Sequence, residues 1–530
     1  MKLKLLKAAG MIGALTLLSR VLGMIRDILS ANSFGTTWQW DAFIYAFMLP
    51  NFMRRLVGEG ALLSAFVPVY TQIVEREGKE SAFRFANIVF TFLFWSLLGF
   101  LLVIELVLLI LIKVPFLPPV VHLTCELLTL LFPYLFFISL CALATAILNS
   151  HHHFFSASLS SIILDLVWIG GVFAAMTWGG YQSETRVILL SIFIFLSGAI
   201  QLGAQVPSLF GLGFIPRFHF DFSHPGLLQI GKLILPSVLG FAIIQINILV
   251  DMTLGFWVGP GANSSLWYGN RLMQFPLGVF AIAMGTALLP AISQHTARKE
   301  IEEAKKALAF ALRSVFFIIL PATVGLMVLR TPIVQLLFER GEFDALSTAR
   351  TSFVVLCYTL GLFAYSGQKL VVTGFYSLQD TKTPVKVGAL TLLLNIIFNL
   401  ILMGPLKEGG LALATSIAGI VNFCLLLYFY NKRTTRFPIR EVLVSSLKIL
   451  MASLAMGVFA WLIYSGIFPM TRGGMTFRLL VSIFGSIGLS GLIYIGFCFL
   501  LRVSEIQDAV RWLVSRKDEK SLGKMGEEPL

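Results

Sequence analysis

Long apolar runs constrain this chain more than any other feature of its sequence. About fourteen runs approach or exceed the 20 residues that a helix needs to cross a bilayer. Within a bilayer every backbone polar group must be satisfied internally, and runs of this length satisfy theirs as helices. The sequence therefore predicts an all-α polytopic membrane protein. The expected spans are 8–32, 41–74, 85–112, 122–148, 155–178, 186–211, 226–257, 263–295, 304–329, 346–377, 384–404, 410–431, 441–467 and 477–501.

The composition excludes several other classes of protein. Hydrophobic residues make up 57% of the chain and charged residues only 13%, which no soluble globular class shows. The net charge of +13 does not indicate nucleic acid, because the basic residues lie in short loops between apolar runs. The sequence contains no nucleophile elbow, phosphate-binding glycine loop or zinc motif, and no region large enough for a catalytic domain. We expect a transporter rather than an enzyme.

The basic residues of the loops predict the orientation of the chain. With the N-terminus placed inside, the inner segments collect far more lysine and arginine than the outer loops, so both termini are expected in the cytoplasm. The first ten residues, MKLKLLKAAG, are basic and precede an apolar run that Arg20 and Arg26 interrupt. We interpret this run as the first span rather than a signal peptide.

Charges are concentrated in one apolar stretch, from Ser19 to Gln72. Each charge at the centre of a spanning helix costs roughly 2.5–3.5 kcal/mol, so four arginines facing lipid would cost on the order of 10 kcal/mol. They are expected to face protein or a watery cavity, and such a cluster is by default a functional site. The charged residues of the stretch are Arg20, Arg26, Asp27, Asp41, Arg54, Arg55 and Glu59.

Helical spacing indicates which of these charges can pair. Arg20 and Asp27 lie on nearly the same helix face, with Arg26 about 100° away. Arg55 and Glu59 form an i, i+4 pair. Asp27 is expected to neutralise a neighbouring arginine. Two or three guanidinium groups are left over, and a guanidinium suits a carboxylate or a phosphate.

A purely structural alternative stays open for the same residues. The arginines could pair internally with Asp41 and Glu59, or extend to the helix ends. This alternative accounts for one or two arginines and poorly for four.

An internal repeat indicates two halves. Ser64–Gln72 (SAFVPVYTQ) and Thr286–Gln294 (TALLPAISQ) share three identical positions, although membrane composition alone could produce such a match. Helix two matching helix eight predicts two pseudo-symmetric six-helix lobes, and paired transporters bind substrate between their halves. The expected regions are 1–222 and 223–436 for the lobes, 437–502 for two further helices and 503–530 for a cytoplasmic basic tail.

The second half carries fewer membrane charges and one group of oxygen-bearing side chains. Arg271 enters the eighth span and Lys369 lies inside the tenth. Carboxylate, amide and hydroxyl oxygens suit a hard cation such as Na+, while the alternative is hydrogen bonding between helices. The group consists of Asp251, Asn395, Asn399 and Thr415.

Four segments carry a resemblance to a known family over nearly the whole chain. SRVLGMIRD, DAFIYAFMLPNFMRRLVGEGALLSAFVP, NRLMQFPLG and GFYSLQDTKTPVK are similar to the MurJ (MviN) family of lipid II flippases. This family belongs to the multidrug/oligosaccharidyl-lipid/polysaccharide exporter superfamily. The resemblance implies fourteen helices, a last helical pair lining a groove for a polyprenyl tail, and a location in the bacterial cytoplasmic (inner) membrane. It further implies movement of undecaprenyl-pyrophosphate-linked disaccharide-pentapeptide from the inner to the outer leaflet by alternating access, for peptidoglycan synthesis.

The resemblance also implies roles for individual residues. The acid expected at 399 is Asn, acids expected at Asn270 and Gln274 are absent, and Ser156–Asp165 lacks an expected proline and asparagine. The possible Na+ site is Asp251, Asn395, Asn399 and Thr415, and no other cofactor is expected. Substrate-binding positions are Arg20, Arg26, Arg54 and Arg271, followed by Arg55, Asp41, Glu59, Lys369 and Asp27.

Other functions stay open at this point. A cation-coupled drug antiporter of the same superfamily would favour acidic residues where this chain has arginines. An exporter of another lipid-linked oligosaccharide fits the basic residues equally. A membrane glycosyl- or acyltransferase lacks its catalytic residues, and a scaffold would not retain costly arginines. The expected partners are lipid II, membrane lipids and cell-wall synthesis proteins, and we expect the membrane potential rather than Na+ to drive transport.

Overall fold

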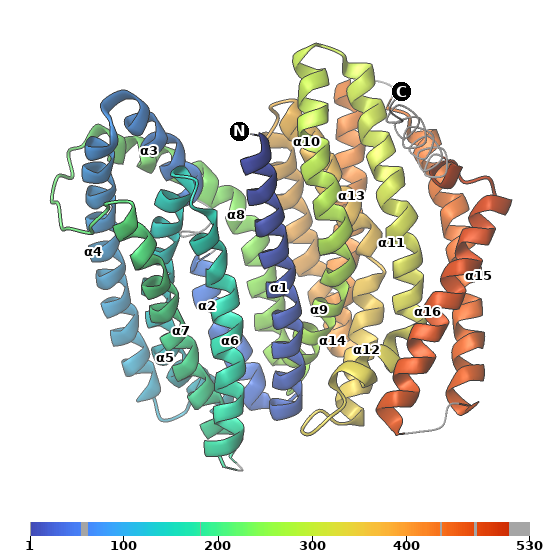
Figure 1. Cartoon of the computed structure of the whole chain (residues 1–530). Coiled ribbons are helices and arrows are strands. Elements are labelled where there is room, and N and C mark those ends of the chain that lie inside the picture. Colours follow the sequence, from blue (N-terminus) through green and yellow to red (C-terminus); the bar gives the residue numbers. More distant parts are fainter. Residues whose placement is uncertain (1, 55–61, 181, 435–436, 471–473, 508–530) are drawn as a thin grey trace, which may run out of the picture. The chain divides into compact units, whose positions relative to one another are not determined.

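The structure, a computed structural model, describes residues 2–54, 62–180, 182–434, 437–470 and 474–507. These residues contain helices and no strand, which confirms the predicted all-α class (Figure 1). The helices are α1 (Lys2–Phe34), α2 (Trp38–Met53), α3 (Leu63–Glu77), α4 (Lys79–Ile112), α5 (Pro119–Ser150), α6 (Phe154–Trp178), α7 (Ser183–Gly211), α8 (Pro225–Val258), α9 (Ala262–Pro276), the π-helix η2 (Leu277–Ala281), α10 (Ile282–Ala297), α11 (Ile301–Phe338), α12 (Ala345–Thr359), α13 (Leu362–Ser377), α14 (Lys382–Thr434), α15 (Ile439–Met470) and α16 (Met475–Leu500).

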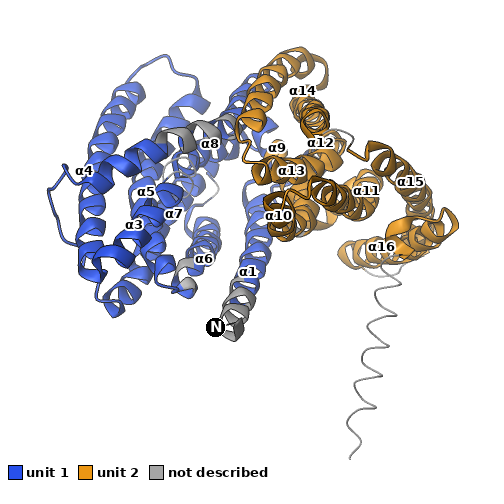
Figure 2. Cartoon of the chain, turned by 90° about the horizontal axis from the view of Figure 1, so that it is seen from above, with its two compact units in different colours: residues 1–264, 340–347 blue, residues 265–339, 348–530 orange. Residues whose placement is uncertain are grey.

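The chain divides into two compact units, which Figure 2 colours separately. Unit 1 comprises residues 1–264 and 340–347, and unit 2 comprises residues 265–339 and 348–530. The short segment 340–347 belongs to unit 1 because the Glu342 N–H donates to the Asn32 carbonyl at 3.0 Å. This division follows packing contacts, whereas the predicted lobes 1–222 and 223–436 follow the repeat, so the lobes stay a prediction.

Helix α5 is the centre of unit 1. It packs against α2, α3, α4, α6 and α7. In its 18-residue apolar segment, 72% of the residues are buried, whereas in the corresponding segment of α4 only 17% are. Close packing is possible because Gly198 of α7 carries no Cβ, which would lie 2.8 Å from the Tyr134 ring of α5. The outer helix α4 therefore presents most of its apolar surface away from the protein.

Unit 2 is built around α11, which packs against α10, α13, α15 and α16. A buried carboxylate ties these helices together beyond the end of α16. Glu505 lies 3.4 Å from Arg313 of α11 and accepts a 2.9 Å hydrogen bond from Ser445 of α15. The Tyr494 hydroxyl of α16 donates to the Phe317 carbonyl of α11 at 2.6 Å. Polar side chains thus fix three apolar helices that dispersion alone would leave free to slide.

The predicted count of fourteen spans stays a prediction. Among the described residues, eight helices are long and apolar enough to cross a membrane, or nine if α12 and α13, bent by 42°, form one span. Several predicted spans are broken into short helices: 41–74 gives α2 and α3, and 263–295 gives α9, η2 and α10. Two others, 384–404 and 410–431, join as α14 with a kink at Lys407. Proline explains two of these breaks, since Pro276 precedes η2 and Pro405 precedes the kink.

Both copies of the sequence repeat lie in short helices. Ser64–Gln72 lies in α3, which has 15 residues, and Thr286–Gln294 lies in α10, which has 16. Each is preceded along the chain by another short helix, α2 or α9. The two segments therefore occupy corresponding places in the order of elements.

The kink in α14 yields a prediction about stability. Lys407 has φ 51° and ψ −133°, a conformation that is strained for a residue with a Cβ. Replacing Lys407 with Gly should raise the free energy of unfolding by about 1 kcal/mol, because glycine adopts this conformation without strain. Thermal unfolding in detergent micelles measures the effect. The matched control is Lys407→Ala, which removes the same charge and keeps the Cβ; an equal gain for the alanine variant would contradict strain as the cause.

Candidate functional site

Arg26 of α1 lies in a buried ion network in unit 1. Arg26 as a whole is only 6% exposed. Nη1 donates to Asp165 Oδ1 at 2.8 Å, and Nε and Nη2 donate to Asp27 Oδ1 at 3.1 and 3.0 Å. The expected neutralisation of an arginine by Asp27 is confirmed. The two carboxylates hold the buried guanidinium on both sides, and removing Arg26 would leave both of them without their cation.

An aromatic ring and two hydroxyls complete this network. The Arg26 guanidinium lies over the Trp168 ring, 4.6 Å from its centroid. Trp168 Nε1 donates to Ser30 Oγ at 3.1 Å, and Ser19 Oγ donates to Asp165 Oδ2 at 3.2 Å. Every group that contacts Arg26 is thereby held by a further hydrogen bond or by burial. We call Arg26, Asp27, Asp165 and Trp168 the Arg26 cluster.

The helix period explains how the cluster forms. Ser19, Arg26 and Ser30 are spaced i, i+7 and i+11 along α1, and side chains at this spacing share one face. That face packs against α6, where Asp165 and Trp168 are three residues apart and share a face in turn. Gly23 lies between these contacts, and a Cβ there would be 3.8 Å from Asp165 Oδ2. The cluster forms where this face of α1 meets the face of α6 that carries Asp165 and Trp168.

Asp41, a predicted binding residue, lies at the start of α2 and makes contacts to backbone. Its Oδ2 accepts from the Gly261 N–H at 2.5 Å, and its Oδ1 accepts from the N–H and hydroxyl of Ser264 at 2.7 and 2.5 Å. The carboxylate thus receives donors from the first turn of α9, a position where negative charge is favourable.

The other predicted residues of unit 1 differ in exposure. Arg20 is exposed on α1, and Arg54, at the end of α2, is half-buried. Arg54 Nε donates to Asn51 Oδ1 at 3.1 Å, which directs the guanidinium back along its own helix. Arg55 and Glu59 lie outside the described residues, so their expected pairing stays a prediction.

In unit 2, Arg271 and Lys369 lie on different helices. Arg271 is half-buried on α9, with its guanidinium 4.6 Å from the Trp267 ring centroid. Asn270 and Gln274, one turn apart on the same helix, are hydrogen-bonded to each other. The π-helix η2 begins six residues after Arg271, and such turns are frequent at functional sites. Lys369 is exposed on α13.

Three of the four predicted cation ligands lie together in unit 2. Asn399 Nδ2 donates to Asn395 Oδ1 at 2.9 Å, and Asn395 Nδ2 donates to Thr415 Oγ1 at 3.3 Å. The amide of Asn395 is therefore engaged at both ends: its bond to Thr415 crosses between the two predicted spans, as the alternative of interhelical hydrogen bonding predicted, and its bond to Asn399 lies within one span. The fourth residue, Asp251, is buried in α8 of unit 1. In the described part of the chain, no three His, Cys, Asp or Glu side chains group as a metal site.

Asp165 and Trp168 were not among the residues predicted from the sequence. Asp165 is the single acid in the apolar run 155–178, and an acid inside a spanning segment is itself a signal of function. The signal was present, but nothing in the sequence indicates which arginine a lone acid in another helix will meet.

Comparison with known proteins gives one consistent result. The family model described as "Lipid II flippase MurJ" matches residues 30–482. A protein of Vibrio cholerae named "Probable lipid II flippase MurJ" is 34% identical over 466 residues, covering 82% of this chain and 86% of its own length. A protein of Haemophilus influenzae with the same name is 32% identical, covering 84% of this chain and 90% of its own.

Solved structures agree with the sequence comparison. A structure of "Lipid II flippase MurJ, inward closed conformation" is similar with a TM-score of 0.75 and 29% identity, covering 93% of this chain and 98% of its own. An inward-facing multidrug resistance MATE family transporter is similar with a TM-score of 0.65 but 16% identity, covering 79% of this chain and 94% of its own. The second likeness concerns the fold alone.

The Arg26 cluster yields a prediction about coupling between two residues. Arg26→Gln and Asp165→Asn should each lower the free energy of unfolding by about 3 kcal/mol, because Arg26→Gln leaves two buried carboxylates without their cation and Asp165→Asn removes one of the two carboxylates on Arg26. The double variant should lose less free energy of unfolding than the sum of the two single losses, with a coupling energy of about 1–3 kcal/mol. Denaturant unfolding in micelles of the wild type, the two single variants and the double variant measures this coupling energy.

The matched control is a second arginine–carboxylate pair of unit 1. Arg186 and Glu342 lie 3.4 Å apart, and the Glu342 side chain is 51% exposed. Solvent screening should keep their coupling below about 1 kcal/mol. Additive effects of the Arg26 and Asp165 substitutions, within about 0.5 kcal/mol, would contradict a shared network.

Proposed function

The chain belongs to the lipid II flippase MurJ family, and from this membership we propose that it moves lipid II from the inner to the outer leaflet by alternating access. The observation that carries the proposal is the family match over residues 30–482, supported by relatives that are 34% and 32% identical across most of the chain. The members of this family are transporters, and this multi-pass membrane protein is a transporter rather than an enzyme.

The arginines fit the chemistry of this substrate. Lipid II carries a pyrophosphate, whose negative charges must cross a slab of low dielectric, and guanidinium groups pair with phosphate oxygens through two parallel hydrogen bonds. We propose Arg20, Arg54 and Arg271 as groups that meet the pyrophosphate, with Arg55, Asp41, Glu59 and Lys369 contributing nearby. An exporter of another lipid-linked oligosaccharide would use the same arginines, so the substrate itself has to be tested.

The Arg26 cluster supports a role in release as well as in binding. In the conformation described, Arg26 is neutralised by Asp27 and Asp165. A pyrophosphate that engages Arg26 has to displace carboxylates that are already well placed. We propose that these carboxylates pair with Arg26 again when the substrate leaves. Such an exchange makes the affinity for the pyrophosphate differ between two conformations, which alternating access requires.

Flipping of lipid II by the purified chain in vesicles tests the proposed function. Replacing Arg26 and Arg271 together by Lys should lower the flipping rate at least about tenfold, because lysine keeps the charge and loses the bidentate geometry. The control is Arg298→Lys, a conservative change at the exposed end of α10, which should leave the rate unchanged.

Two outcomes would separate the parts of this proposal. Wild-type protein that flips another lipid-linked oligosaccharide in preference to lipid II would overturn the substrate. A double lysine variant that flips lipid II at the wild-type rate would overturn bidentate recognition while leaving the function intact.

We propose that the chain lies in the bacterial cytoplasmic membrane with both termini inside, near the enzymes that make and use lipid II. The family supports this membrane, and the excess of basic residues in alternate loops supports the orientation. In a variant without the five native cysteines, a membrane-impermeant thiol reagent should label a cysteine at Trp38 in intact cells and spare one at Lys79. Labelling at Lys79 would overturn the orientation.

For the driving force, we propose the membrane potential rather than Na+. An inside-negative potential is worth about 2.3 kcal/mol per charge per 100 mV and assists outward movement of an anion. The candidate cation ligands fit Na+ only in part, because Asn395 uses both ends of its amide in hydrogen bonds to Asn399 and Thr415. Asp251 supplies the single carboxylate of the set.

Flipping measured in cells separates the two driving forces. With Na+ removed at constant potential, flipping should continue at nearly its normal rate. With the potential collapsed at constant Na+, it should fall severalfold. The reverse pattern, loss without Na+ and survival without potential, would establish cation coupling instead.

A further inference from the structure

An extended segment between α7 and α8 lies along the outer helix α4. We call residues 214–224, which read FIPRFHFDFSH, the aromatic strap. Asn87 of α4 donates through Nδ2 to the Ile215 carbonyl at 3.3 Å and accepts from the Arg217 N–H at 2.9 Å. One turn further, Thr91 Oγ1 accepts from the His219 N–H at 2.8 Å. The strap is therefore attached to α4 at regular intervals.

The side chains of the strap alternate in character. Phe218, Phe220 and Phe222 occupy even positions, and Arg217, His219 and Asp221 occupy odd ones. An extended chain directs successive side chains to opposite sides, so alternation separates an aromatic side from a polar side.

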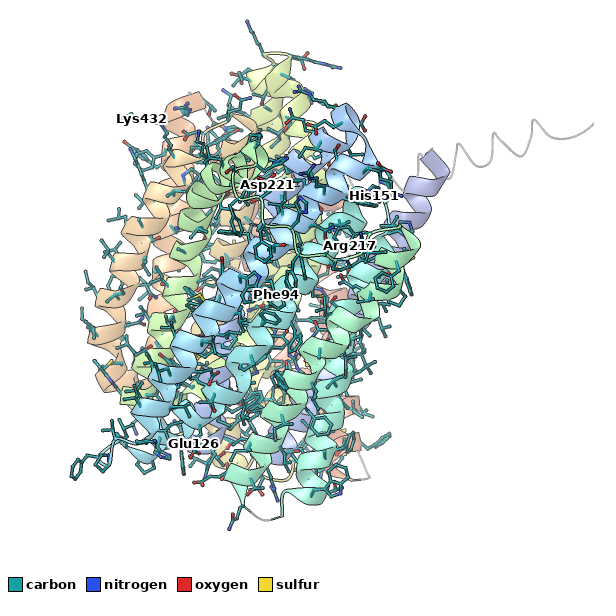
Figure 3. The ribbon with its side chains drawn as sticks, turned by 90° about the vertical axis from the view of Figure 1, so that its left-hand side faces the viewer. Phe94, Glu126, His151, Arg217, Asp221 and Lys432 are labelled. Atoms are coloured by element: carbon teal, nitrogen blue, oxygen red, sulfur yellow. The ribbon has the colours of Figure 1, made fainter. Side chains whose placement is uncertain are left out.

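The aromatic side stays at the surface instead of joining the core. The Phe218 ring lies 5.0 Å from the Phe94 ring and 6.0 Å from the Trp95 ring, and the Phe222 ring lies 6.2 Å from the Phe92 ring. Yet Phe218, Phe220 and Phe222 are 49%, 64% and 53% exposed. The strap thus extends the exposed aromatic surface of α4. Figure 3 faces this side of the protein and labels Phe94 and Arg217 on it.

The length of α4 sets the depth of the strap in the bilayer. The 34 residues of α4 measure about 51 Å, while the hydrocarbon core is about 30 Å thick and takes about 20 residues. If the far end of α4 meets the opposite boundary, the core begins near Phe92. The strap contacts α4 from Arg84 to Trp95, at the level of the headgroups and the first acyl carbons. Trp is enriched at this level, and Trp95 of α4 lies beside the Phe218 ring.

Basic side chains accompany the rings at this level. Arg217 and Arg84 are both exposed, and Arg84 Nε donates to His219 Nε2 at 3.0 Å. His151, near the same end of unit 1, adds little charge at neutral pH. Burial lowers its pKa below the usual value, and the charges of Lys79, His153 and His152 lower it further. The strap itself carries one acid, Asp221, four residues from Arg217. Positive charge beside exposed rings complements a lipid with an anionic headgroup.

We propose that the aromatic strap and the adjoining turns of α4 form a binding site for an anionic phospholipid of the leaflet on this side. The phenylalanine rings contact the glycerol and upper acyl region. Arg217 and Arg84 pair with the headgroup phosphate. Bound lipid fixes the connection between α7 and α8, the segment at which the chain passes from the first six predicted spans to the next six. The site lies apart from the Arg26 cluster and takes no part in the proposed flipping steps, so either proposal can fail without the other.

Native mass spectrometry of the full-length protein in micelles tests the site, with phosphatidylglycerol and phosphatidylcholine of identical acyl chains as probes. The wild type should bind phosphatidylglycerol in preference. Arg217→Gln should weaken phosphatidylglycerol binding roughly fivefold and leave phosphatidylcholine binding unchanged, as expected for one surface arginine. Phe220→Ser should weaken both lipids, because it removes an exposed ring rather than a charge.

Lys113→Gln is the matched control, since it removes one exposed positive charge just beyond the other end of α4. It should leave phosphatidylglycerol binding at this site unchanged, with the thermal midpoint of each variant verifying its fold. The proposal is overturned if Lys113→Gln weakens binding as much as Arg217→Gln, or if neither Arg217→Gln nor Phe220→Ser weakens it. It is also overturned if inorganic phosphate displaces the lipid at equal concentration, which would identify a site for soluble anions.

Discussion

The cost of placing an arginine in apolar surroundings governs the organisation of unit 1. Arg26 lies within α1 and is almost fully buried, so its charge has to be compensated within the protein. Asp27 comes from the same helix and Asp165 from another, which makes the packing of α1 on α6 a condition for burying the arginine. Trp168 supplies an aromatic face to the same guanidinium. A polar network thus specifies the register of two helices whose apolar faces would fit together in several ways.

Breaks in the helices place the other functional candidates. Arg54 follows the last residue of α2, and Arg271 lies in α9 shortly before a π-helix. At such points the backbone leaves regular α-geometry, and in a membrane this is tolerated where protein or water satisfies the freed groups. Lys407 marks another break, with a positive φ that is strained for a residue with a Cβ. Several predicted spans are consequently broken or kinked, although their apolar composition alone would predict straight helices.

Fold and function separate clearly in this protein. Its helical arrangement is similar to that of a MATE family transporter at 16% identity, so the fold accommodates more than one kind of substrate. Membership of the flippase family rests on sequence, and the arginines in and after the first two helices are the groups proposed to meet the substrate. Among the residues predicted for Na+, Asn395 joins the two arms of α14 by donating to Thr415, and Asn399 donates to Asn395 within one arm.

The sequence by itself determined the all-α membrane class, the family and the identity of the candidate arginines. These follow from local properties: the length of apolar runs, the cost of a charge within them, and short motifs. It also placed the break between 384–404 and 410–431, where the structure has the Lys407 kink. It did not reveal that Asp165, 139 residues further along the chain, is the partner of Arg26, or that the aromatic strap lies on α4. Only tertiary structure decided these pairings, because a helix period shows which face a side chain occupies and not which helix packs against that face.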